Sequence, residues 1–377
     1  MLFRSVAAPA AHCGGLTPSD GKLPLSCTRP VTRPVLLCGY YGEHNLGDDA
    51  LLESLLAQLP ASVTPLVTAF DQPAVEQRHG VATVQRRSLR SVLGAQRRCR
   101  ALVLGGGSLL QDSTSFRSLL YYGALIVAAR LQGQPVLLWA QGLGPLRRRR
   151  SRLLARLLLP LATAISWRDA GSARLARQLG CGAPHGADAV WALTPLPWLG
   201  RGGPIVVCWR PTALLDRQGW AVLLEALAEL ADTHDREVLW LPFHGSQDHG
   251  LLHQLQQQGL MPASLQRRSR QLEATEPREA MAVFRSAGLV VAMRLHALIL
   301  AALSGAPVAA LSYDPKVQAC ALEFGCGCTD LDDRLPPAAS LAAAWAEALD
   351  APAGLEPLAQ MRQATALHRQ LLQRLGG

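Results

Sequence analysis

The chain has 377 residues, which is too long for one ordinary core and favours two domains. About half of its residues are apolar, as in soluble globular proteins, and its longest apolar stretch (297–311) falls short of the ~20 residues of a membrane span, which argues against an integral membrane protein. The net charge of +9 favours anionic partners such as phosphates, nucleic acid or a membrane surface.

The nine cysteines do not have the spacing of a metal site, because the Cys-x-Cys at 326–328 has no second pair at a suitable distance. We therefore expect no bound metal. An odd number of cysteines without a secretion signal fits a reducing cytosol, so we expect a cytoplasmic protein. Residues 1–33 lack the apolar core of a signal peptide and are predicted to be a disordered N-terminal extension.

In chain order, short apolar runs typical of buried strands alternate with helical patterns. The first half contains predicted strands at 34–40, 63–70, 101–107, 135–142 and 164–169. Between them lie amphipathic stretches such as "DDALLESLLAQL" and "FRSLLYYGALIVAARLQG". This alternation predicts a parallel sheet with helices on both faces.

The Pro- and Gly-rich segment "TPLPWLGRGGP" (194–204) is the predicted linker. After it the same alternation begins again, with predicted strands at 204–210, 237–245, 288–294 and 307–314.

The predicted fold is α/β, with two Rossmann-like, doubly wound domains that face a central cleft. We expect these domains over residues 34–195 and 203–340, followed by C-terminal helices over 341–377. Ligands of such sheets bind beyond the carboxyl ends of the strands, so the residues that follow each strand are candidates for the site.

The loop after the first predicted strand, "YGEHNLGDDA", has glycines that would suit a phosphate loop, but it carries two aspartates that would repel a phosphate. Asp48 and Asp49 have two interpretations. They are either capping and dipole-compensating residues of a helix start, or acceptors of hydroxyl protons from a polyol such as a sugar. We assign both to catalysis, and Asn45 of the same loop to substrate binding.

Three further positions in the first domain are candidates for substrate binding. Gly106 and Gly107 end a strand, where glycine allows the backbone to approach a ligand or a packed helix. Gln141 is suited to hydrogen-bond sugar hydroxyls, unless it belongs to a plain Gly-Pro turn. Arg168 is placed toward the cleft by the end of its strand, unless it is an ordinary surface residue.

The second domain supplies cationic candidates for substrate binding: Arg210, His244, Arg294 and Lys316 all follow predicted strands. Lys316 is one of only two lysines beside 35 arginines, which suggests a need for a compact cation rather than an accident of sequence. His296 lies near a helix start, where anionic ligands are favoured. Such a set suits a small anion that carries phosphate or carboxylate groups.

Six motifs, in order "GYYGEHNLGDDALL", "GGGSLLQD", "QGLGP", "SWRDAGS", "MRLHALILAA" and "LSYDPKV", resemble the blocks of the polysaccharide pyruvyl transferase family. The likeness covers about residues 34–330 and is closest to the bacterial CsaB type. It implies a fold like that of the GT-B glycosyltransferases. It also implies transfer of the enolpyruvyl group of phosphoenolpyruvate to two sugar hydroxyls, forming a pyruvate ketal and releasing phosphate.

In the family, an Arg-x-His block and a downstream lysine are linked to the donor, and these match Arg294, His296 and Lys316. We take His296 as the catalytic acid. The expected acceptor is an N-acetylhexosamine of a cell-wall polysaccharide or exopolysaccharide precursor, free or lipid-linked. Phosphoenolpyruvate is expected as a co-substrate, with no separate cofactor. Two places depart from the usual family pattern: His44 and Leu46 in the first motif, and the segment "HGADAVWAL" at 185–193.

Two other interpretations remain. The first is a GT-B glycosyltransferase that uses a nucleotide sugar, which would share the fold. The second is a non-catalytic binder of nucleic acid or of a membrane surface through "LRRRRSRLLARLLLPL" (146–161), unless that segment is a solvated helix start over a buried face. We expect no nucleic-acid partner, and peripheral contact with the inner face of the membrane.

Overall fold

The structure is a computed structural model that describes residues 33–113, 115–331 and 334–376. Apart from Arg33, the predicted N-terminal extension lies outside the described residues. From Arg33 onward the chain forms one compact unit.

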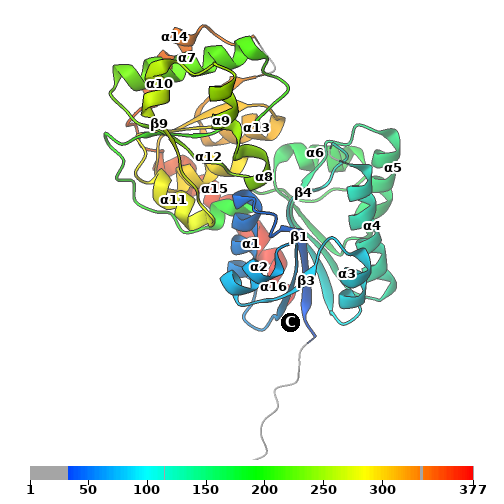
Figure 1. Ribbon diagram of the computed structural model, residues 1–377. Coiled ribbons are helices and arrows are strands. Elements are labelled where there is room, and N and C mark those ends of the chain that lie inside the picture. Colours follow the sequence, from blue (N-terminus) through cyan, green and yellow to red (C-terminus); the bar gives the residue numbers. More distant parts are fainter. Residues whose placement is uncertain (1–32, 114, 332–333, 377) are drawn as a thin grey trace, which may run out of the picture. The chain divides into compact units, whose positions relative to one another are not determined.

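Two parallel six-stranded sheets organise this unit (Figure 1). The first has the spatial order β3-β2-β1-β4-β5-β6 and consists of β1 (Val35–Tyr41), β2 (Pro65–Ala69), β3 (Ala82–Gln85), β4 (Ala101–Leu110), β5 (Val136–Leu143) and β6 (Ala164–Trp167). Its connections contain α1 (Leu46–Gln58), α2 (Gln72–His79), α3 (Leu89–Gln96), α4 (Phe116–Leu131) and α5 (Arg149–Leu158), the last followed by the 3₁₀ helix η1 (Leu159–Leu161). After β6 come α6 (Ala170–Gln178) and the 3₁₀ helix η2 (Ala189–Ala192).

The second sheet has the order β12-β11-β10-β7-β8-β9 and consists of β7 (Ile205–Cys208), β8 (Val238–Trp240), β9 (Ser269–Gln271), β10 (Leu289–Ala292), β11 (Val308–Ser312) and β12 (Gly327–Asp330). Its helices are α7 (Arg217–Thr233), α8 (Gly245–Asp248), α9 (Leu251–Gln257), α10 (Ala263–Arg268), α11 (Pro277–Phe284), α12 (Leu295–Leu303) and α13 (Pro315–Phe324). Three helices end the chain: α14 (Ala338–Ala348), α15 (Leu355–Ala364) and α16 (Ala366–Gln373). The prediction of two doubly wound α/β halves is confirmed.

Three strands were absent from the prediction, and all three lie at sheet edges. β3 borders the first sheet, while β9 and β12 border the second. No residue of these strands is fully buried, whereas all four residues of β7 are. An edge strand has at most one face packed against the core. It therefore does not need the continuous apolar run that identifies a central parallel strand.

The prediction also placed two strand ends too early. β4 continues through its glycines to Leu110, and β5 continues to Leu143. Gly106 and Gly107 have positive φ angles of 75° and 69°, and the register of β4 against β5 shifts after Gly107. The glycines therefore form an irregularity inside a strand. Gln141 lies within β5, inside the predicted strand at 135–142, and not in a Gly-Pro turn.

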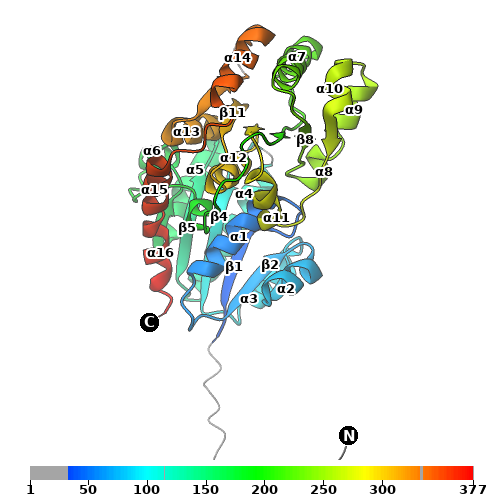
Figure 2. The ribbon, with the colours of Figure 1, turned by 90° about the vertical axis from the view of Figure 1, so that its left-hand side faces the viewer.

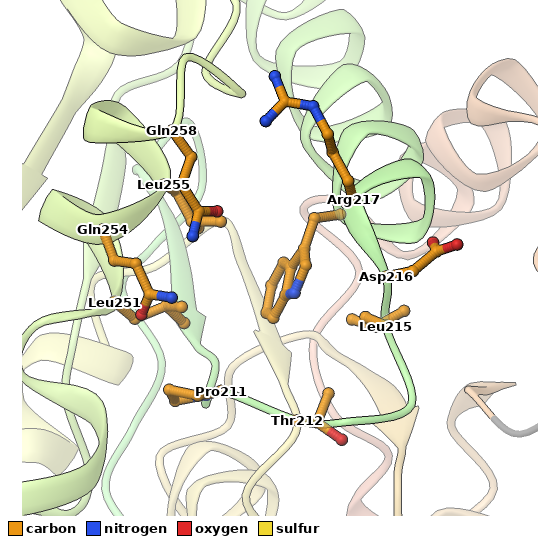
Figure 3. A pocket seen from close by; sticks show the side chains of 10 residues that line it. Pro211, Thr212, Leu215, Asp216, Arg217, Leu251, Gln254, Leu255 and Gln258 are labelled. Carbon is orange, nitrogen blue, oxygen red and sulfur yellow. The ribbon is translucent and has the colours of Figure 1, made fainter.

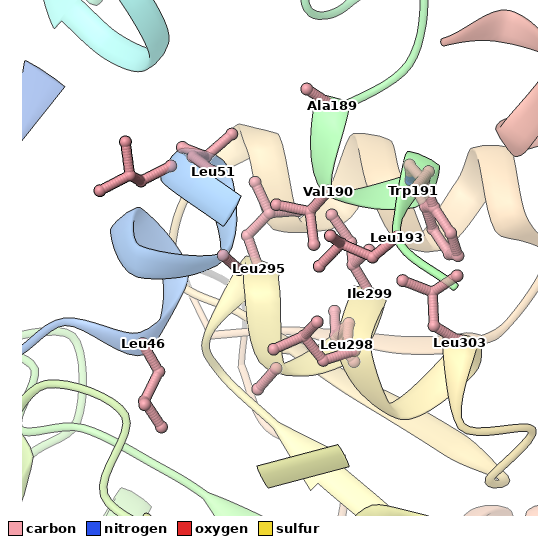
Figure 4. Packing of buried hydrophobic residues seen from close by; sticks show 14 of the residues in the cluster. Leu46, Leu51, Ala189, Val190, Trp191, Leu193, Leu295, Leu298, Ile299 and Leu303 are labelled. Carbon is pink, nitrogen blue, oxygen red and sulfur yellow. The ribbon is translucent and has the colours of Figure 1, made fainter. Parts of the chain in front are cut away.

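A hydrophobic cluster joins the two halves at α1, η2 and α12 (Figure 4). Leu51 of α1, Val190 of η2 and Leu295 of α12 are all buried in it. Because α1 and α12 contact each other through this cluster, the beginnings of two helices from different sheets are held close together.

The C-terminal helices divide between the halves. α14 packs against α7, whereas α16 returns to β5 and β6 (Figure 2). His368 of α16 is fully buried, with Nδ1 2.8 Å from Ser166 Oγ and Nε2 2.7 Å from the Ala187 carbonyl oxygen. None of the described helices is long and apolar enough to cross a membrane.

Candidate functional site

Asn45 is the residue that caps α1. Its Oδ1 accepts a hydrogen bond from the Gly47 amide at 3.1 Å, and its Nδ2 donates to the Asp48 carboxylate. Asp48 and Asp49 follow Gly47 in the first turn of the helix. Since Asn45 is the side-chain cap of α1, the two aspartates are not its caps, and their place in the first turn also suits the helix dipole.

Gly47 provides the surface against which His296 lies. A Cβ atom built on Gly47 would stand 2.0 Å from Nδ1 and 2.8 Å from Cγ of the His296 ring. Only a residue without a side chain leaves room for the imidazole at this point. The second residue of α12 thus lies directly on the first turn of α1, which comes from the other half.

Asp188 faces the opposite nitrogen of the same ring. Its Oδ2 lies 3.4 Å from His296 Nε2, and its Oδ1 accepts the Val190 amide at 3.0 Å as the cap of η2. Burial raises the pKa of Asp188, but His296 and Arg168 more than offset this and lower it to about 2. An ionised carboxylate fixed in this way orients the ring and stabilises positive charge on it.

The two ring nitrogens of His296 therefore differ in what they can do. Nε2 is buried and faces Asp188. Nδ1 lies over Gly47 and makes no hydrogen bond within the described part of the chain. A proton exchanged with a substrate would pass through Nδ1.

Asp48 lies in the electrostatic field of His296. Burial raises the pKa of the Asp48 carboxyl to about 6, against the opposing effects of His296 and Lys316 and with a further upward effect from Asp49. Its Oδ1 lies 3.7 Å from the Cβ position of Gly107. A carboxylate with a pKa near 6 can both accept and return a proton close to neutral pH.

Asp49 has a different environment. It is buried and pairs with Arg78, whose Nη1 lies 3.2 Å from Asp49 Oδ2. Arg78 also contacts Glu276 at 3.2 Å and donates to the Thr275 carbonyl oxygen at 2.7 Å. Burial raises the pKa of Asp49, and Arg78 opposes this. Asp49 thus belongs to an ion network that joins α1, α2 and α11.

Arg294 is held by a buried carboxylate that the sequence did not identify as its partner. Its Nε donates to Asp248 Oδ2 at 3.0 Å, and Nη2 contacts Asp248 Oδ1 and Gln247 Oε1. Asp248 also accepts the amides of Phe243 and His244, so it is fixed in place. Arg294 Nη1 makes no hydrogen bond within the described ranges and is the group left for a ligand.

Lys316 is the second residue of α13 and is more accessible than Arg294. Its side chain is 34% exposed, and Nζ lies 3.6 Å from Asp314 Oδ2. Arg210 donates from Nη1 to the Tyr313 hydroxyl at 3.2 Å and stands over the Tyr313 ring. The loop after β11 therefore brings both cations to the carboxyl edge of the second sheet.

His244 lies where the two halves hydrogen-bond to each other. Residues Asn45 and His244 form an isolated antiparallel bridge. The Leu46 amide donates to the Phe243 carbonyl oxygen at 3.0 Å, and the Gly245 amide donates to the His44 carbonyl oxygen at 2.9 Å. The loop before α1 and the loop after β8 are consequently one joined structure.

Gln141 and the glycines of β4 have internal partners. Gln141 is fully buried and donates from Nε2 to the carbonyl oxygens of Leu104 and Gly106 at 3.1 and 3.0 Å. A Cβ on Gly106 would lie 2.9 Å from Leu51 of α1. These residues shape the strand beneath Asp48, and the prediction that Gln141 meets sugar hydroxyls does not fit its burial.

Arg168 is also buried. Its Nε lies 3.0 Å from Asp169 Oδ2 and 3.8 Å from Asp188 Oδ2, and its Nη2 donates to Ser108 Oγ at 3.4 Å. It is therefore not an ordinary surface residue. Arg168 contacts Asp188, which in turn contacts His296, so Arg168 helps to hold Asp188 in place beside the His296 ring.

A pocket of about 430 Å³ lies elsewhere, between the start of α7 and α9 (Figure 3). It is lined by Pro211, Thr212, Leu215, Asp216, Arg217, Trp220, Leu251, Gln254, Leu255 and Gln258. None of the predicted site residues lines it, and Asp216 is engaged in capping α7. The pocket is therefore separate from the residues around His296 and Asp48. Among the described residues, no three His, Cys, Asp or Glu side chains are grouped to hold a metal ion.

Comparison with known proteins gives a family match over most of the chain. The family model described as polysaccharide pyruvyl transferase matches residues 45–315. No curated protein matches the chain. The matched range includes Asp48, Asp188, His296 and Arg294 and ends immediately before Lys316.

Solved structures resemble the chain in fold. Anabaena Alr3699/HepE in complex with UDP and glucose is 14% identical, with 91% of this chain and 98% of that chain covered and a TM-score of 0.55. UDP-GlcNAc 2-epimerase from Neisseria meningitidis bound to UDP-GlcNAc is 11% identical, with 90% and 100% covered and a TM-score of 0.57. These likenesses confirm the predicted GT-B-like fold of two Rossmann-like halves.

Proposed function

Because the chain belongs to the polysaccharide pyruvyl transferase family, we propose that it transfers the enolpyruvyl group of phosphoenolpyruvate to two hydroxyls of a sugar. The products would be a pyruvate ketal and phosphate. Within the family we propose the CsaB type, acting on an N-acetylhexosamine of a cell-wall or surface polysaccharide precursor. The observation that carries this proposal is the contact of His296 with the helix turn that bears Asp48.

The donor would bind on the side of the second sheet. Arg294 Nη1 and Lys316 Nζ are assigned to its phosphate and carboxylate groups, and Arg210 to the same anion. A guanidinium held in one orientation by Asp248 presents Nη1 as a single directed donor, whereas the lysine acts as a point charge. Contacts of this kind contribute about 1.5–3 kcal/mol each.

The first chemical step is protonation of the donor. The methylene carbon of phosphoenolpyruvate takes a proton from His296 Nδ1, which turns the methylene into a methyl group and leaves cationic character at carbon two. Asp188 at Nε2 stabilises the charged ring before transfer. The first sugar hydroxyl then adds to carbon two while Asp48 accepts its proton.

The second step closes the ketal. The phosphate group leaves carbon two, and the cation that forms is attacked by the second hydroxyl. The proton of this hydroxyl passes to the departing phosphate or to the now neutral His296. The atoms therefore balance as phosphoenolpyruvate plus a diol giving a ketal plus phosphate, with no cofactor consumed.

The test uses the purified chain with phosphoenolpyruvate and a panel of N-acetylhexosamine acceptors, free and lipid-linked. Released phosphate and a new ketal methyl signal in the proton NMR spectrum of the acceptor should appear together, and only with both substrates. His296→Gln serves as the inactive control. Phosphate release without ketal formation in every acceptor would count against the proposal.

A second candidate is a glycosyltransferase that uses a nucleotide sugar, because UDP or UDP-GlcNAc is bound in two of the similar structures. Similarity of fold at 11–14% identity leaves the donor open. A thermal-shift comparison of phosphoenolpyruvate with UDP and UDP-GlcNAc separates the two candidates. Stabilisation by the nucleotides alone, with UDP released in the presence of an acceptor, would favour the second.

A further inference from the structure

Helix α5 carries large apolar side chains on its solvent side. Leu153 and Leu157, one turn apart, are 60% and 63% exposed. The opposite side of the helix is occupied by Ser151, Ala155 and Leu158, which are all buried. A helix of a globular protein normally presents polar residues outward, so packing among the described residues does not explain the two leucines.

Helix α4 continues this apolar surface. Leu120, Val127 and Leu131 are exposed and follow one another at spacings of seven and four residues, which places them in one stripe. α4 packs beside α5, where Leu158 of α5 lies against Gly123 of α4 (Figure 1). We call the outer side of these two helices the α4–α5 face.

The same face is strongly basic. Between Asp112 and Asp169 the chain has nine arginines and no aspartate or glutamate. Six of the arginines fall within residues 147–156, and all six are exposed. Asp112 does not neutralise them at the surface, since it is buried and its carboxylate accepts the amides of Arg147 and Arg148 at 2.9 Å each.

The arginines and leucines of α5 share one side of the helix. Arg149, Arg152 and Arg156 follow one another at spacings of three and four residues and lie beside Leu153 on the exposed surface. An anionic membrane provides both partners for such a surface: lipid phosphates attract the arginines, and the boundary of the acyl chains accepts the leucines.

We propose that the α4–α5 face docks the protein on the surface of an anionic membrane. Nucleic acid is the less suitable partner, because it would leave the leucines in water. The Phe116 ring, which a base could otherwise stack on, is covered by the Arg150 guanidinium. The proposal goes beyond the pyruvyl transfer and does not depend on it, since the face lies outside the residues assigned to the reaction.

The experiment is sedimentation of the full chain with vesicles of phosphatidylglycerol and phosphatidylcholine in equal parts, compared with phosphatidylcholine alone. The wild type should bind the anionic vesicles at least ~10-fold more strongly, because each basic residue near such a surface adds attraction. Two variants test the two components: Leu153→Gln with Leu157→Gln, and Arg149→Gln with Arg152→Gln and Arg156→Gln. Each should lower binding by at least ~10-fold.

Matched controls change the same residue types elsewhere. Leu199→Gln with Leu355→Gln replaces leucines that are 68% and 82% exposed, and Arg201→Gln with Arg362→Gln and Arg369→Gln removes three exposed charges. Both controls should bind vesicles within about twofold of the wild type, and all variants should keep its thermal unfolding midpoint.

Three outcomes would overturn the proposal. The wild type could remain in the supernatant with anionic vesicles. The leucine variant could bind as well as the wild type. Finally, an RNA oligonucleotide at the same ionic strength could bind more tightly than the vesicles and lose affinity only in the arginine variant, which would make the α4–α5 face a nucleic-acid surface.

Discussion

The His296 ring lies so close to Gly47 that a methyl group at residue 47 would stand 2.0 Å from Nδ1. Gly47→Ala should therefore displace the imidazole and lower kcat by about 10²-fold, because small displacements of a reacting group have effects of that size. Steady-state assay of ketal formation measures this. Gly94→Ala is the matched control, since nothing lies within 4 Å of its Cβ position in α3. Wild-type kcat in Gly47→Ala would show that the ring position is unimportant.

His296→Gln tests the assignment of the proton donor. Glutamine keeps hydrogen-bonding capacity but cannot protonate carbon, so kcat should fall at least ~10²-fold while donor binding persists. Calorimetric titration with phosphoenolpyruvate measures the binding, and stopped assays measure kcat. If kcat is retained and only donor affinity is lost, His296 is a phosphate ligand and the proton comes from another group.

Asp188→Asn should act through His296. The amide can occupy the same space and keep the cap of η2, but it carries no charge to stabilise a protonated ring. We expect kcat to fall by about 10–10³-fold, and His296→Gln combined with Asp188→Asn to be no worse than His296→Gln alone. Additive losses in this double-mutant cycle would mean that Asp188 acts independently of His296.

The two aspartates of α1 should differ in the pH dependence of the reaction. Since the pKa of Asp48 is raised to about 6, its basic form is lost as the pH falls through 6, and kcat should fall with it. The phosphate of the donor also titrates near pH 6, so the acidic limb must be compared between variants. Asp48→Asn should lower kcat by ~10²–10⁴-fold. The fall in kcat at acidic pH that comes from protonation of Asp48 should also disappear, leaving only the part caused by the donor phosphate.

Asp49→Asn is the paired control for this pH profile. It removes a charge from the network with Arg78 and should affect stability more than the reaction. It should retain the acidic limb, with the midpoint moved to lower pH because the Asp49 charge no longer raises the pKa of Asp48. An unchanged limb in Asp48→Asn, or its loss in Asp49→Asn, would contradict the assignment of the base.

Arg294 should be important for both donor binding and stability. Its partner Asp248 has no exposed side-chain surface, so Arg294→Ala leaves a buried carboxylate unpaired and should lower the free energy of unfolding by about 3–5 kcal/mol. Arg294→Gln combined with Asp248→Asn should recover part of this stability without recovering the donor KM. Lys316→Ala, at a position 34% exposed, should raise the donor KM by ~10-fold or more with little change in stability. Denaturant unfolding and the KM for phosphoenolpyruvate measure the two effects, and equal stability of Arg294→Ala and the wild type would contradict this account.

The sequence predicted the central strands, the doubly wound order and the family because these depend on local patterns. Buried parallel strands require continuous apolar runs such as "PVLLCGY", and glycines and charged residues follow them at fixed places. The edge strands β3, β9 and β12 lacked this signal. Their register depends on a neighbour that only the folded sheet supplies.

Part of the candidate site could be predicted because its residues also occupy fixed places relative to the strands and helices. Asn45, Asp48, His296, Arg294 and Lys316 follow strands or begin helices, so topology alone brings them to the same edge. Asp188 and Asp248 were not assigned roles, because their partners lie 108 and 46 residues away and are chosen by tertiary packing. The one available signal for Asp188 was its place in a polar loop between two apolar segments, and many loop residues share it.

The loop that carries Asn45 and the loop that carries His244 are hydrogen-bonded to each other through their backbones. Neither can therefore be redesigned alone. In chimaeras built to change the acceptor sugar, transplanting residues 42–48 from a relative would bring a backbone path fitted to a different partner. Exchanging 42–48 together with 243–248 keeps the two hydrogen-bonded loops matched. The two segments must therefore be transferred as one unit, although nearly 200 residues separate them.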